Sequence, residues 1–318
     1  SGVVRTHVVC RKKFDQGVVK QAMEAGAHLW LLSKPKDAEV EKDHVNLQVE
    51  RDGELVEIKC DLLIGADGAH SWTRRKFKMG KPKEFMVGFQ TDVTGLTGED
   101  NWLEMYTGKD VAPGLFAWVI PSGNGTHRIG LWARSEDLEG KSVEQYYNAL
   151  INHPKWKKRF EGVKEISRYC GPVPCGIIRK PFKDRVMVIG DAAGMSKPTT
   201  GGGIGPGFRQ VESIIENLTN AITSNNLSAS SLSKVCKPYK VMRKEQARAR
   251  ALRDLLVTIP SDEELDAHFE MFNRPEVIDL INKIGDIENP VALGFTLLKK
   301  VPEFRMLALK AGMKLILA

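Results

Sequence analysis

The sequence predicts an α/β fold that is combined with an antiparallel sheet and followed by a helical region. Residues 185–207 contain a short buried strand, an acidic turn, a glycine-rich loop and the start of a helix. Residues 84–134 alternate between apolar and polar side chains, with turn residues between them, which favours an antiparallel sheet. Beyond residue 222 the apolar spacing is helical. The chain is therefore expected to divide into the parts 1–78, 79–180, 181–222 and 223–318.

The composition is that of a globular protein with a mild excess of positive charge. The chain has 318 residues, of which 42% are hydrophobic, and a formal net charge of +7. Its five cysteines are scattered and form no Cys-x-x-Cys pair, so we expect no metal site, no disulfide framework and a cytoplasmic location. Basic residues do not alternate with aromatic ones, which argues against a nucleic-acid partner. The charge favours an anionic membrane surface or substrate, although surplus surface lysine explains it equally well.

The first part of the chain is expected to mix strands with one helix. The predicted elements are a strand over 1–9, a helix from Arg11 to Gly26, a strand over 28–32, and strands over 45–51 and 55–60. Asp52-Gly53 joins the last two strands and is a strong hairpin signal. A further strand then runs into a glycine turn within residues 61–75.

The remaining elements are marked by capping and stop signals. The strands expected in the sheet cover 84–94, 102–106, 114–120, 127–133 and 163–173. Capping boxes at Ser142 and Ser261 predict helix starts, the first helix extending to about Phe160. The later helices are expected over 232–259, 275–284 and 302–318, with a turn at Pro290.

The glycine-rich loop is the strongest candidate for a binding site. Such a loop lets the backbone approach a ligand, and a following helix N-terminus presents N–H groups to anions. Asp191, at the end of a strand, can accept hydrogen bonds from sugar-like hydroxyls. These properties suit a flavin, which carries a polyol and a ring that becomes anionic. A turn that merely packs a helix on a sheet is the alternative, and this many glycines would make it costly.

Other candidates are less specific. Arg11 precedes a helix and is equally well explained as a solvated charge or as a contact to a pyrophosphate. Phe116, Trp118 and Pro121 lie on a predicted hairpin, where aromatic residues usually belong to a core but can also face a ligand. The segment from Asp67 to Arg74 could be a plain strand-to-helix turn.

Several separated motifs resemble one family of flavoproteins and occur in its order. They are Arg11 to Asp15, Asp67 to Arg74, Pro113 to Pro121, Gly190 to Gly194 with Pro198, and Thr200 to Ile204. This set is similar to the geranylgeranyl reductase family, within the para-hydroxybenzoate hydroxylase-like flavoproteins. Residues 262–290 resemble the C-terminal region of the archaeal digeranylgeranylglycerophospholipid reductases.

The resemblance implies a fold, a cofactor and a reaction. The fold would be a Rossmann-type FAD domain in two segments, with an antiparallel substrate sheet between them and a helical C-terminal region. The reaction would be FAD-dependent saturation of isoprenoid double bonds in geranylgeranyl groups of archaeal-type membrane lipids. NAD(P)H or a ferredoxin would supply electrons, and the substrate implies peripheral membrane contact.

The resemblance also assigns site residues, although it names no catalytic side chain. The cofactor residues would be Arg11, Gly190, Asp191, Pro198, Gly202, Gly203 and Ile204. Phe116, Trp118 and Pro121 would line a tunnel for the prenyl chain, with Phe116 and Ile120 in place of the family's usual tyrosine and phenylalanine.

The chain departs from the family at its start. The family's first strand, its Gly-x-Gly-x-x-Gly turn and the acidic residue that follows have no counterpart here. By analogy we expect roughly a hundred further residues before Ser1, and weak FAD binding without them. The alternatives are an aromatic monooxygenase or halogenase of the same superfamily, and a truncated chain without catalysis. The monooxygenases usually carry a bulky polar residue where this chain has Gly194.

Overall fold

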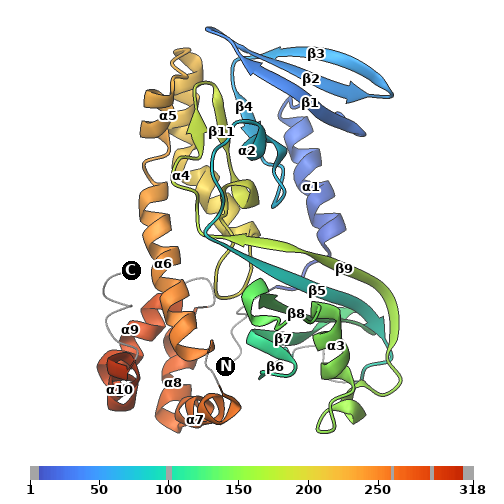
Figure 1. Ribbon diagram of the computed structural model, residues 1–318, viewed down its shortest axis with the longest axis vertical. Helices are drawn as coiled ribbons and strands as arrows, with labels where there is room; N and C mark the ends of the chain where they lie inside the picture. The colour runs from blue at the N-terminus through green and yellow to red at the C-terminus, as the bar shows by residue number, and fades with distance from the viewer. Residues whose placement is uncertain (1–6, 98–101, 259–260, 287–289, 311–318) are drawn as a thin grey trace.

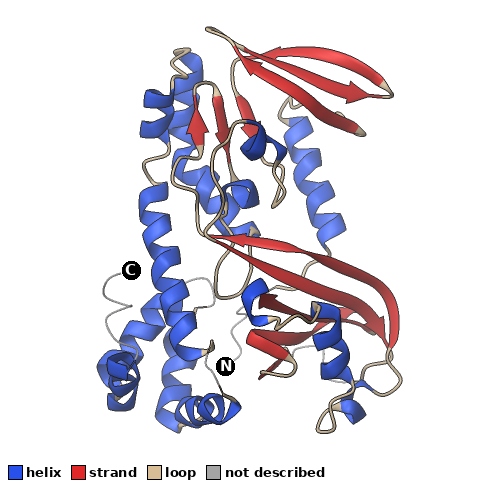
Figure 2. Ribbon diagram, viewed as in Figure 1, coloured by secondary structure: helices blue, strands red, loops and turns tan. Residues whose placement is uncertain are grey.

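The fold combines three β-sheets with helices that are concentrated in the C-terminal half of the chain (Figures 1 and 2). The computed structural model describes residues 7–97, 102–258, 261–286 and 290–310. The strands are β1 (Ser33–Val40), β2 (Val45–Arg51), β3 (Glu54–Cys60), β4 (Leu63–Gly65), β5 (Glu84–Thr94), β6 (Glu104–Gly108), β7 (Ala112–Gly123), β8 (Thr126–Arg134), β9 (Lys164–Cys175), β10 (Phe182–Lys183) and β11 (Val186–Val188). The helices are α1 (Arg11–Glu24), α2 (Trp72–Lys76), α3 (Val143–Ile151), α4 (Ile204–Thr223), α5 (Ala229–Val235), α6 (Tyr239–Leu256), α7 (Asp262–Phe272), α8 (Pro275–Ile284), α9 (Pro290–Lys300) and α10 (Pro302–Lys310).

Two small sheets lie at one end of the molecule (Figure 1). In the first, β1, β2 and β3 form an antiparallel meander, and the β2–β3 turn is made by Asp52 and Gly53 with φ of 53° and 85°. These positive φ angles are those of the hairpin turn that the dipeptide predicts. In the second sheet β11 pairs with β10 and, in parallel, with β4. This parallel pair brings residues 63–65 beside residues 186–188, as an α/β sheet requires.

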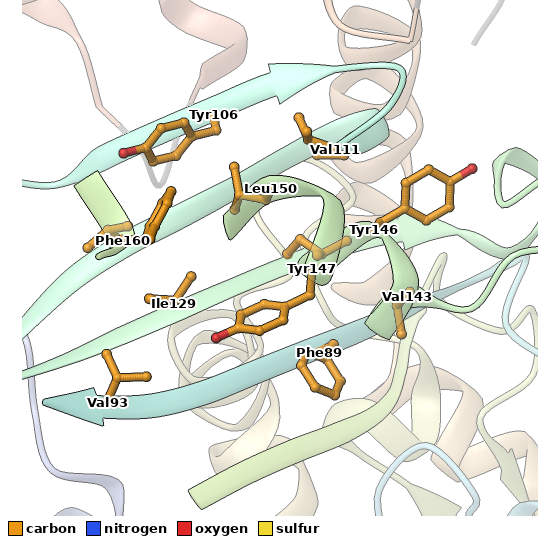
Figure 3. Packing of buried hydrophobic residues seen from close by; sticks show 14 of the residues in the cluster. Phe89, Val93, Tyr106, Val111, Ile129, Val143, Tyr146, Tyr147, Leu150 and Phe160 are labelled. Atoms are coloured by element: carbon orange, nitrogen blue, oxygen red, sulfur yellow. The ribbon is translucent and has the colours of Figure 1, made fainter. Parts of the chain in front are cut away.

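The larger sheet has the strand order β6-β7-β8-β5-β9 and is antiparallel throughout. Helix α3 covers one of its faces, and the buried side chains between them form the largest apolar cluster (Figure 3). Phe89, Ile129 and Leu150 are typical members of this cluster. The predicted strands of this region and the Ser142 capping box are thus confirmed.

The helical region follows α4 and is dominated by α6, which runs along the long axis of the molecule (Figure 1). The expected single helix over 232–259 is wrong, because the chain forms α5 and α6 with a break at residues 236–238, which include Pro238. Proline lacks the N–H that a continuous helix needs at this point. The predicted turn at Pro290 is also wrong, since proline is favoured in the first turn of a helix and Pro290 begins α9.

The N-terminal segment differs most from the expectation. Residues 28–32 form no strand, and Leu32 has φ of 50°, which a strand does not allow; β1 begins only at Ser33. Helix α1 was predicted and is present, but none of its residues is buried, and Val18, Val19 and Met23 remain exposed. Residues 7–10 are irregular, and the rest of the predicted strand over 1–9 lies outside the described residues.

One predicted helix is shorter than expected, and another is described only in part. Helix α3 ends at Ile151, and Pro154 shortly after it prevents continuation to Phe160. Helix α10 covers the predicted segment as far as Lys310, and residues 311–318 lie outside the described chain. None of the described helices is long and apolar enough to cross a bilayer.

Candidate functional site

The glycine-rich loop connects β11 to α4 in the way the sequence predicts. After β11, residues Gly190–Ala193 form one turn of 3-10 helix, and Gly194 closes it in the left-handed region with φ of 81°. The Gly190 N–H donates to Oε1 of Gln210, a buried residue of α4, at 2.6 Å. Helix α4 therefore fixes the turn that carries Asp191, through the Gln210 side chain.

Asp191 and Gly203 lie against each other across the loop. Asp191 Oδ1 accepts a hydrogen bond from Ser196 Oγ at 2.7 Å. A side chain at Gly203 would place its Cβ 2.8 Å from the same carboxylate oxygen. Only glycine therefore lets the start of α4 approach the carboxylate this closely.

The loop contains polar groups that its own residues do not satisfy. Gly203 caps α4 without a side-chain hydrogen bond, and the N–H groups of Ile204 and Gly205 stand in the first turn, where a helix offers no acceptor. The hydroxyls of Thr199 and Thr200 are buried and make no hydrogen bond within the described chain. A buried donor without a partner costs free energy, so these groups fit a polar ligand seated on the loop. Their chemistry matches a flavin, whose reduced ring is anionic.

Helix α6 supports this loop through side chains that the sequence did not reveal as functional. Gln246 Nε2 donates to the carbonyl oxygens of Gly194, Met195 and Ser196 at 3.3, 2.9 and 3.1 Å. Arg253 Nη1 donates to the Pro198 carbonyl at 3.0 Å. The loop is therefore fixed from a helix that follows it in the chain. No local sequence motif indicates a role for Gln246 or Arg253, because the sequence of α6 predicts only a basic helix.

Arg253 is itself held by a largely buried carboxylate. Its side chain is 2% exposed and forms an ion pair with Glu84 on β5, with an Nη2–Oε1 distance of 2.9 Å. Arg250 joins the same carboxylate at 3.0 Å. Burial alone would raise the pKa of Glu84, but the two guanidinium groups outweigh it and hold the pKa below its ordinary value. This network connects strand β5 of the large sheet, helix α6 and the glycine-rich loop.

The Asp67–Arg74 motif forms a compact turn that also contacts the loop. Asp67 Oδ2 accepts hydrogen bonds from the N–H and the hydroxyl of Thr73 at 2.8 and 3.0 Å. The Ser71 hydroxyl caps α2. Arg74 is 5% exposed and donates to the carbonyls of Ala192 and Ala69, both at 2.7 Å. The motif is thus tied to the residue directly after Asp191.

Arg11 lies at the start of α1, where its side chain is 58% exposed and paired with Asp15 at 3.2 Å. One turn later Phe14 meets Phe208 of α4 edge-to-face, with ring centroids 6.3 Å apart. Residues three apart share a helix face, so Arg11 lies on the side of α1 that faces Phe208 of α4. The described contacts of Arg11 itself are those to Asp15, and its role toward a cofactor stays a prediction.

The predicted substrate residues divide between the two faces of the large sheet. Phe116 and Trp118 lie on the face opposite α3, with ring centroids 6.2 Å apart. Gly130 opposes Trp118 on β8, and a Cβ there would stand 2.5 Å from the indole ring. Pro121 alternates to the α3 face, together with Val119. The structure thus brings Phe116 and Trp118 together and separates Pro121 from them.

Trp132 connects this aromatic pair to the glycine-rich loop. Its ring meets Phe116 edge-to-face at 5.6 Å. On its other side lies Gly201, where a Cβ would stand 1.8 Å from a ring carbon of Trp132. Trp132 is 2% exposed, and its Nε1–H has no partner in the described chain. Sequence reasoning missed this residue, since a tryptophan on a strand gives no sign of what it contacts.

Comparison with known proteins places this geometry in a family. The model of the FAD binding domain family matches residues 3–229. Digeranylgeranylglycerophospholipid reductase 2 of Methanothermobacter thermautotrophicus is 31% identical over 271 residues, which cover 83% of this chain and 68% of that protein. The reductase of the same name from Methanocaldococcus jannaschii is 32% identical over 267 residues, 82% of this chain and 67% of that protein.

Solved structures show the same fold. A geranylgeranyl bacteriochlorophyll reductase-like protein of Thermoplasma acidophilum gives a TM-score of 0.79 at 22% identity, covering 95% of this chain and 75% of that one. The flavin-dependent halogenase CmlS gives 0.67 at 16% identity, covering 93% and 59%. The family match and the identities above 30% show that the chain belongs to the FAD-dependent oxidoreductases of the geranylgeranyl reductase family.

Proposed function

We propose that this protein saturates carbon–carbon double bonds in the geranylgeranyl groups of archaeal-type membrane lipids. The observation that carries the proposal is the continuity of the Phe116, Trp118 and Trp132 cluster with the glycine-rich loop at Gly201. An apolar wall that begins at a flavin loop suits a substrate without polar groups at its reacting carbons. Relatives that are 31% and 32% identical to this chain are named digeranylgeranylglycerophospholipid reductases.

The residues of the loop would hold and polarise the cofactor. Reduced FAD, when bound, would supply a hydride to one carbon of the double bond, and a proton from solvent would complete the saturation at the other carbon. Asp191 would accept hydrogen bonds from the ribityl hydroxyls, while Gly202, Gly203 and Ile204 bring backbone N–H groups and the α4 dipole to the anionic ring edge. Gly190 shapes the turn before them.

Two other residues would act at a distance from the ring. Pro198 contributes through its carbonyl, which Arg253 fixes at 3.0 Å. Arg11 would exchange part of its pairing with Asp15 for a phosphate of the cofactor, since a guanidinium binds phosphate well and its present ion pair is exposed.

The sheet would orient the lipid. Phe116 and Trp118 would contact the prenyl chain, and Gly130 makes room for the indole to lie flat over the strands. Pro121 would support the strand from the other face instead of touching the lipid. NAD(P)H or a ferredoxin is the proposed donor, and the proposed location is cytoplasmic, at a membrane surface.

Product analysis tests the proposal. The FAD-loaded protein is incubated anaerobically with a chemical reductant and digeranylgeranylglycerophospholipid, and the lipid is examined by mass spectrometry. We expect a gain of two hydrogens for each reduced double bond. Trp118→Ala should slow this reaction without changing flavin content, whereas Phe269→Ala, on α7, should not. An unchanged lipid in the presence of fully reduced flavin contradicts the proposal.

An aromatic monooxygenase or halogenase is the second candidate, because solved enzymes of those classes share the fold. The structure leaves no room for a bulky side chain at Gly194, where a Cβ would stand 2.8 Å from the Gly176 carbonyl oxygen. NADPH-driven oxygen consumption that requires a phenolic substrate would favour this second candidate over the reductase.

A further inference from the structure

Half of the basic side chains of helix α6 are used inside the protein. The helix contains six basic and two acidic residues. Arg250 and Arg253 pair with Glu84 of β5. Arg243 donates to the carbonyls of residues 178 and 179, both at 3.3 Å. The inward-facing side of α6 therefore accounts for three of its six positive charges.

The other three cations form a stripe on the solvent-facing side of the helix. Lys240, Lys244 and Arg248 are exposed, and their spacing of four residues places them on one face, the α6 stripe. Within the part of the chain that the structure describes, none of the three forms a salt bridge, and both carboxylates of α6 are paired with other arginines. Val241, beside the stripe, is 60% exposed. The charge of the stripe is therefore not neutralised by the protein itself.

The stripe leads to α9, where an exposed aromatic side chain joins a further cation. Leu252, four residues after Arg248, lies against Gly294 of α9, where a Cβ would stand 2.8 Å from its Cδ2. Phe295 follows directly and is 53% exposed. Lys299 is four residues later, on the same face of α9, and is exposed. Helix α9 thus presents an apolar and a basic side chain to solvent close to the end of the stripe.

Helix α10 adds a second pair of the same kind. The Arg305 side chain is exposed and donates to the carbonyls of Leu298 and Lys299, which keeps it beside the end of α9. Leu309, one turn further along α10, is 74% exposed. The carboxylate of Glu303, the one acidic residue in the sequences of α9 and α10, is used in an ion pair. This end of the helical region therefore combines apolar side chains with uncompensated positive charge.

We propose that the α6 stripe and the exposed side of α9 and α10 form a docking surface for a bilayer that contains anionic phospholipid. Lipid phosphates attract lysine and arginine near a membrane surface, and this surface lacks carboxylates of its own that are free to compete. Phe295 and Leu309 can enter the boundary between head groups and acyl chains, as the apolar side chains of interfacial helices do. A second copy of the chain fits this surface poorly, because like charges repel.

The inference rests on these surface side chains and not on the proposed lipid reduction. It names the face by which the protein would contact a membrane, and binding is measured without any turnover. A protein that docks but leaves the lipid unreduced would support the surface and contradict the reaction. The two proposals can therefore fail separately.

The test is co-sedimentation of the FAD-loaded protein with vesicles of phosphatidylcholine, alone or mixed with an equal part of phosphatidylglycerol. We expect binding to the mixed vesicles that weakens as salt is added, and little binding to phosphatidylcholine alone. Lys240→Ala, Lys244→Ala and Arg248→Ala should each weaken binding roughly fivefold, and the triple variant about a hundredfold. Alanine favours a helix, so these variants should keep the circular dichroism spectrum and the flavin content of the wild type.

The matched control removes the same charge from another surface. Lys155, Lys157 and Lys158, which follow α3, are exposed and form no salt bridge in the described chain. Their triple alanine variant lowers the net charge by the same amount as the α6 triple variant. It should weaken vesicle binding far less, because contact charges act within about 10 Å of the membrane.

The apolar part of the surface is tested at high salt, where the charges are screened. Phe295→Ala and Leu309→Ala should each weaken the remaining binding roughly fivefold, since each loses apolar area that the bilayer would cover. Leu55→Ala, on β3, removes a side chain that is 66% exposed at the other end of the molecule and should leave binding unchanged.

Three results would overturn the inference. The first is equal binding to vesicles with and without phosphatidylglycerol. The second is a control lysine variant that loses as much binding as the α6 triple variant, which would reduce the effect to net charge. The third is binding of a duplex oligonucleotide that requires the α6 stripe, together with no binding of vesicles, which would assign the stripe to nucleic acid.

Discussion

Gly201→Ala is predicted to disrupt the contact between the glycine-rich loop and the large sheet. Gly201 has φ of 67°, and a Cβ at this position would stand 1.8 Å from the nearest carbon of the Trp132 ring. Alanine therefore meets two separate penalties here, one from the backbone and one from the ring. The neighbouring Gly202 meets neither to the same degree, since its Cβ would stand 3.0 Å from the flexible end of Lys197.

The magnitude follows from these two penalties. The left-handed backbone costs a non-glycine residue about 1–2 kcal/mol. Displacing a packed ring costs about 1–3 kcal/mol more. We therefore expect Gly201→Ala to lower the free energy of unfolding by about 2–5 kcal/mol, a large share of the 5–15 kcal/mol that is typical of domains. Gly202→Ala should cost less than about 1 kcal/mol.

Urea unfolding, followed by circular dichroism, measures both variants and separates the penalties. In a Trp132→Ala background the ring is absent, so Gly201→Ala should cost only the backbone part, about 1–2 kcal/mol. The two substitutions should thus be coupled by about 1–3 kcal/mol. Equal costs of Gly201→Ala with and without the Trp132 ring would refute the contact.

Three further predictions concern groups around the loop. Asp191→Ala should weaken FAD binding about tenfold or more in a fluorescence titration, since it removes a charged hydrogen-bond acceptor; unchanged affinity would contradict its proposed role. Gln246→Leu should lower the free energy of unfolding in urea by about 1–3 kcal/mol, because three loop carbonyls lose their donor. Glu84 has a lowered pKa in the folded protein, so its stabilisation is present above its unfolded value of about 4.3 and is lost as the pH falls through the folded value. The difference in unfolding free energy between wild type and Glu84→Gln should therefore shrink as the pH falls below about 4.3, the unfolded pKa. A difference that stays constant with pH would contradict the lowered pKa of Glu84 in the folded protein.

The elements that the sequence predicted correctly are those with local signals. Asp52-Gly53 determines its hairpin through its own backbone preference, and the turn angles agree. Pro275 begins α8 and Gly285 directly follows it, as the sequence predicts. The family assignment and the FAD cofactor, inferred from spaced motifs, are confirmed by the comparisons.

The features that the sequence did not reveal depend on contacts between distant segments. Residues 28–32 are as apolar as a buried strand, but strand pairing needs a neighbour, and in the described chain this segment has none. The contacts of Trp132 and Gln246 with the glycine-rich loop depend on how β8 and α6 pack against that loop, which the sequence does not indicate. Pro121 shows a similar limit, because its face depends on the register of β7 with β8.

A single turnover tests the central proposal most directly. The FAD-loaded protein is photoreduced without oxygen and then mixed with the geranylgeranyl lipid, while the absorbance of oxidised flavin is followed. If the aromatic cluster at Gly201 receives the prenyl chain beside the flavin, the oxidised spectrum returns in proportion to the double bonds reduced. Reduced flavin that persists in the presence of the lipid, and reoxidises only when air is admitted, would contradict the account.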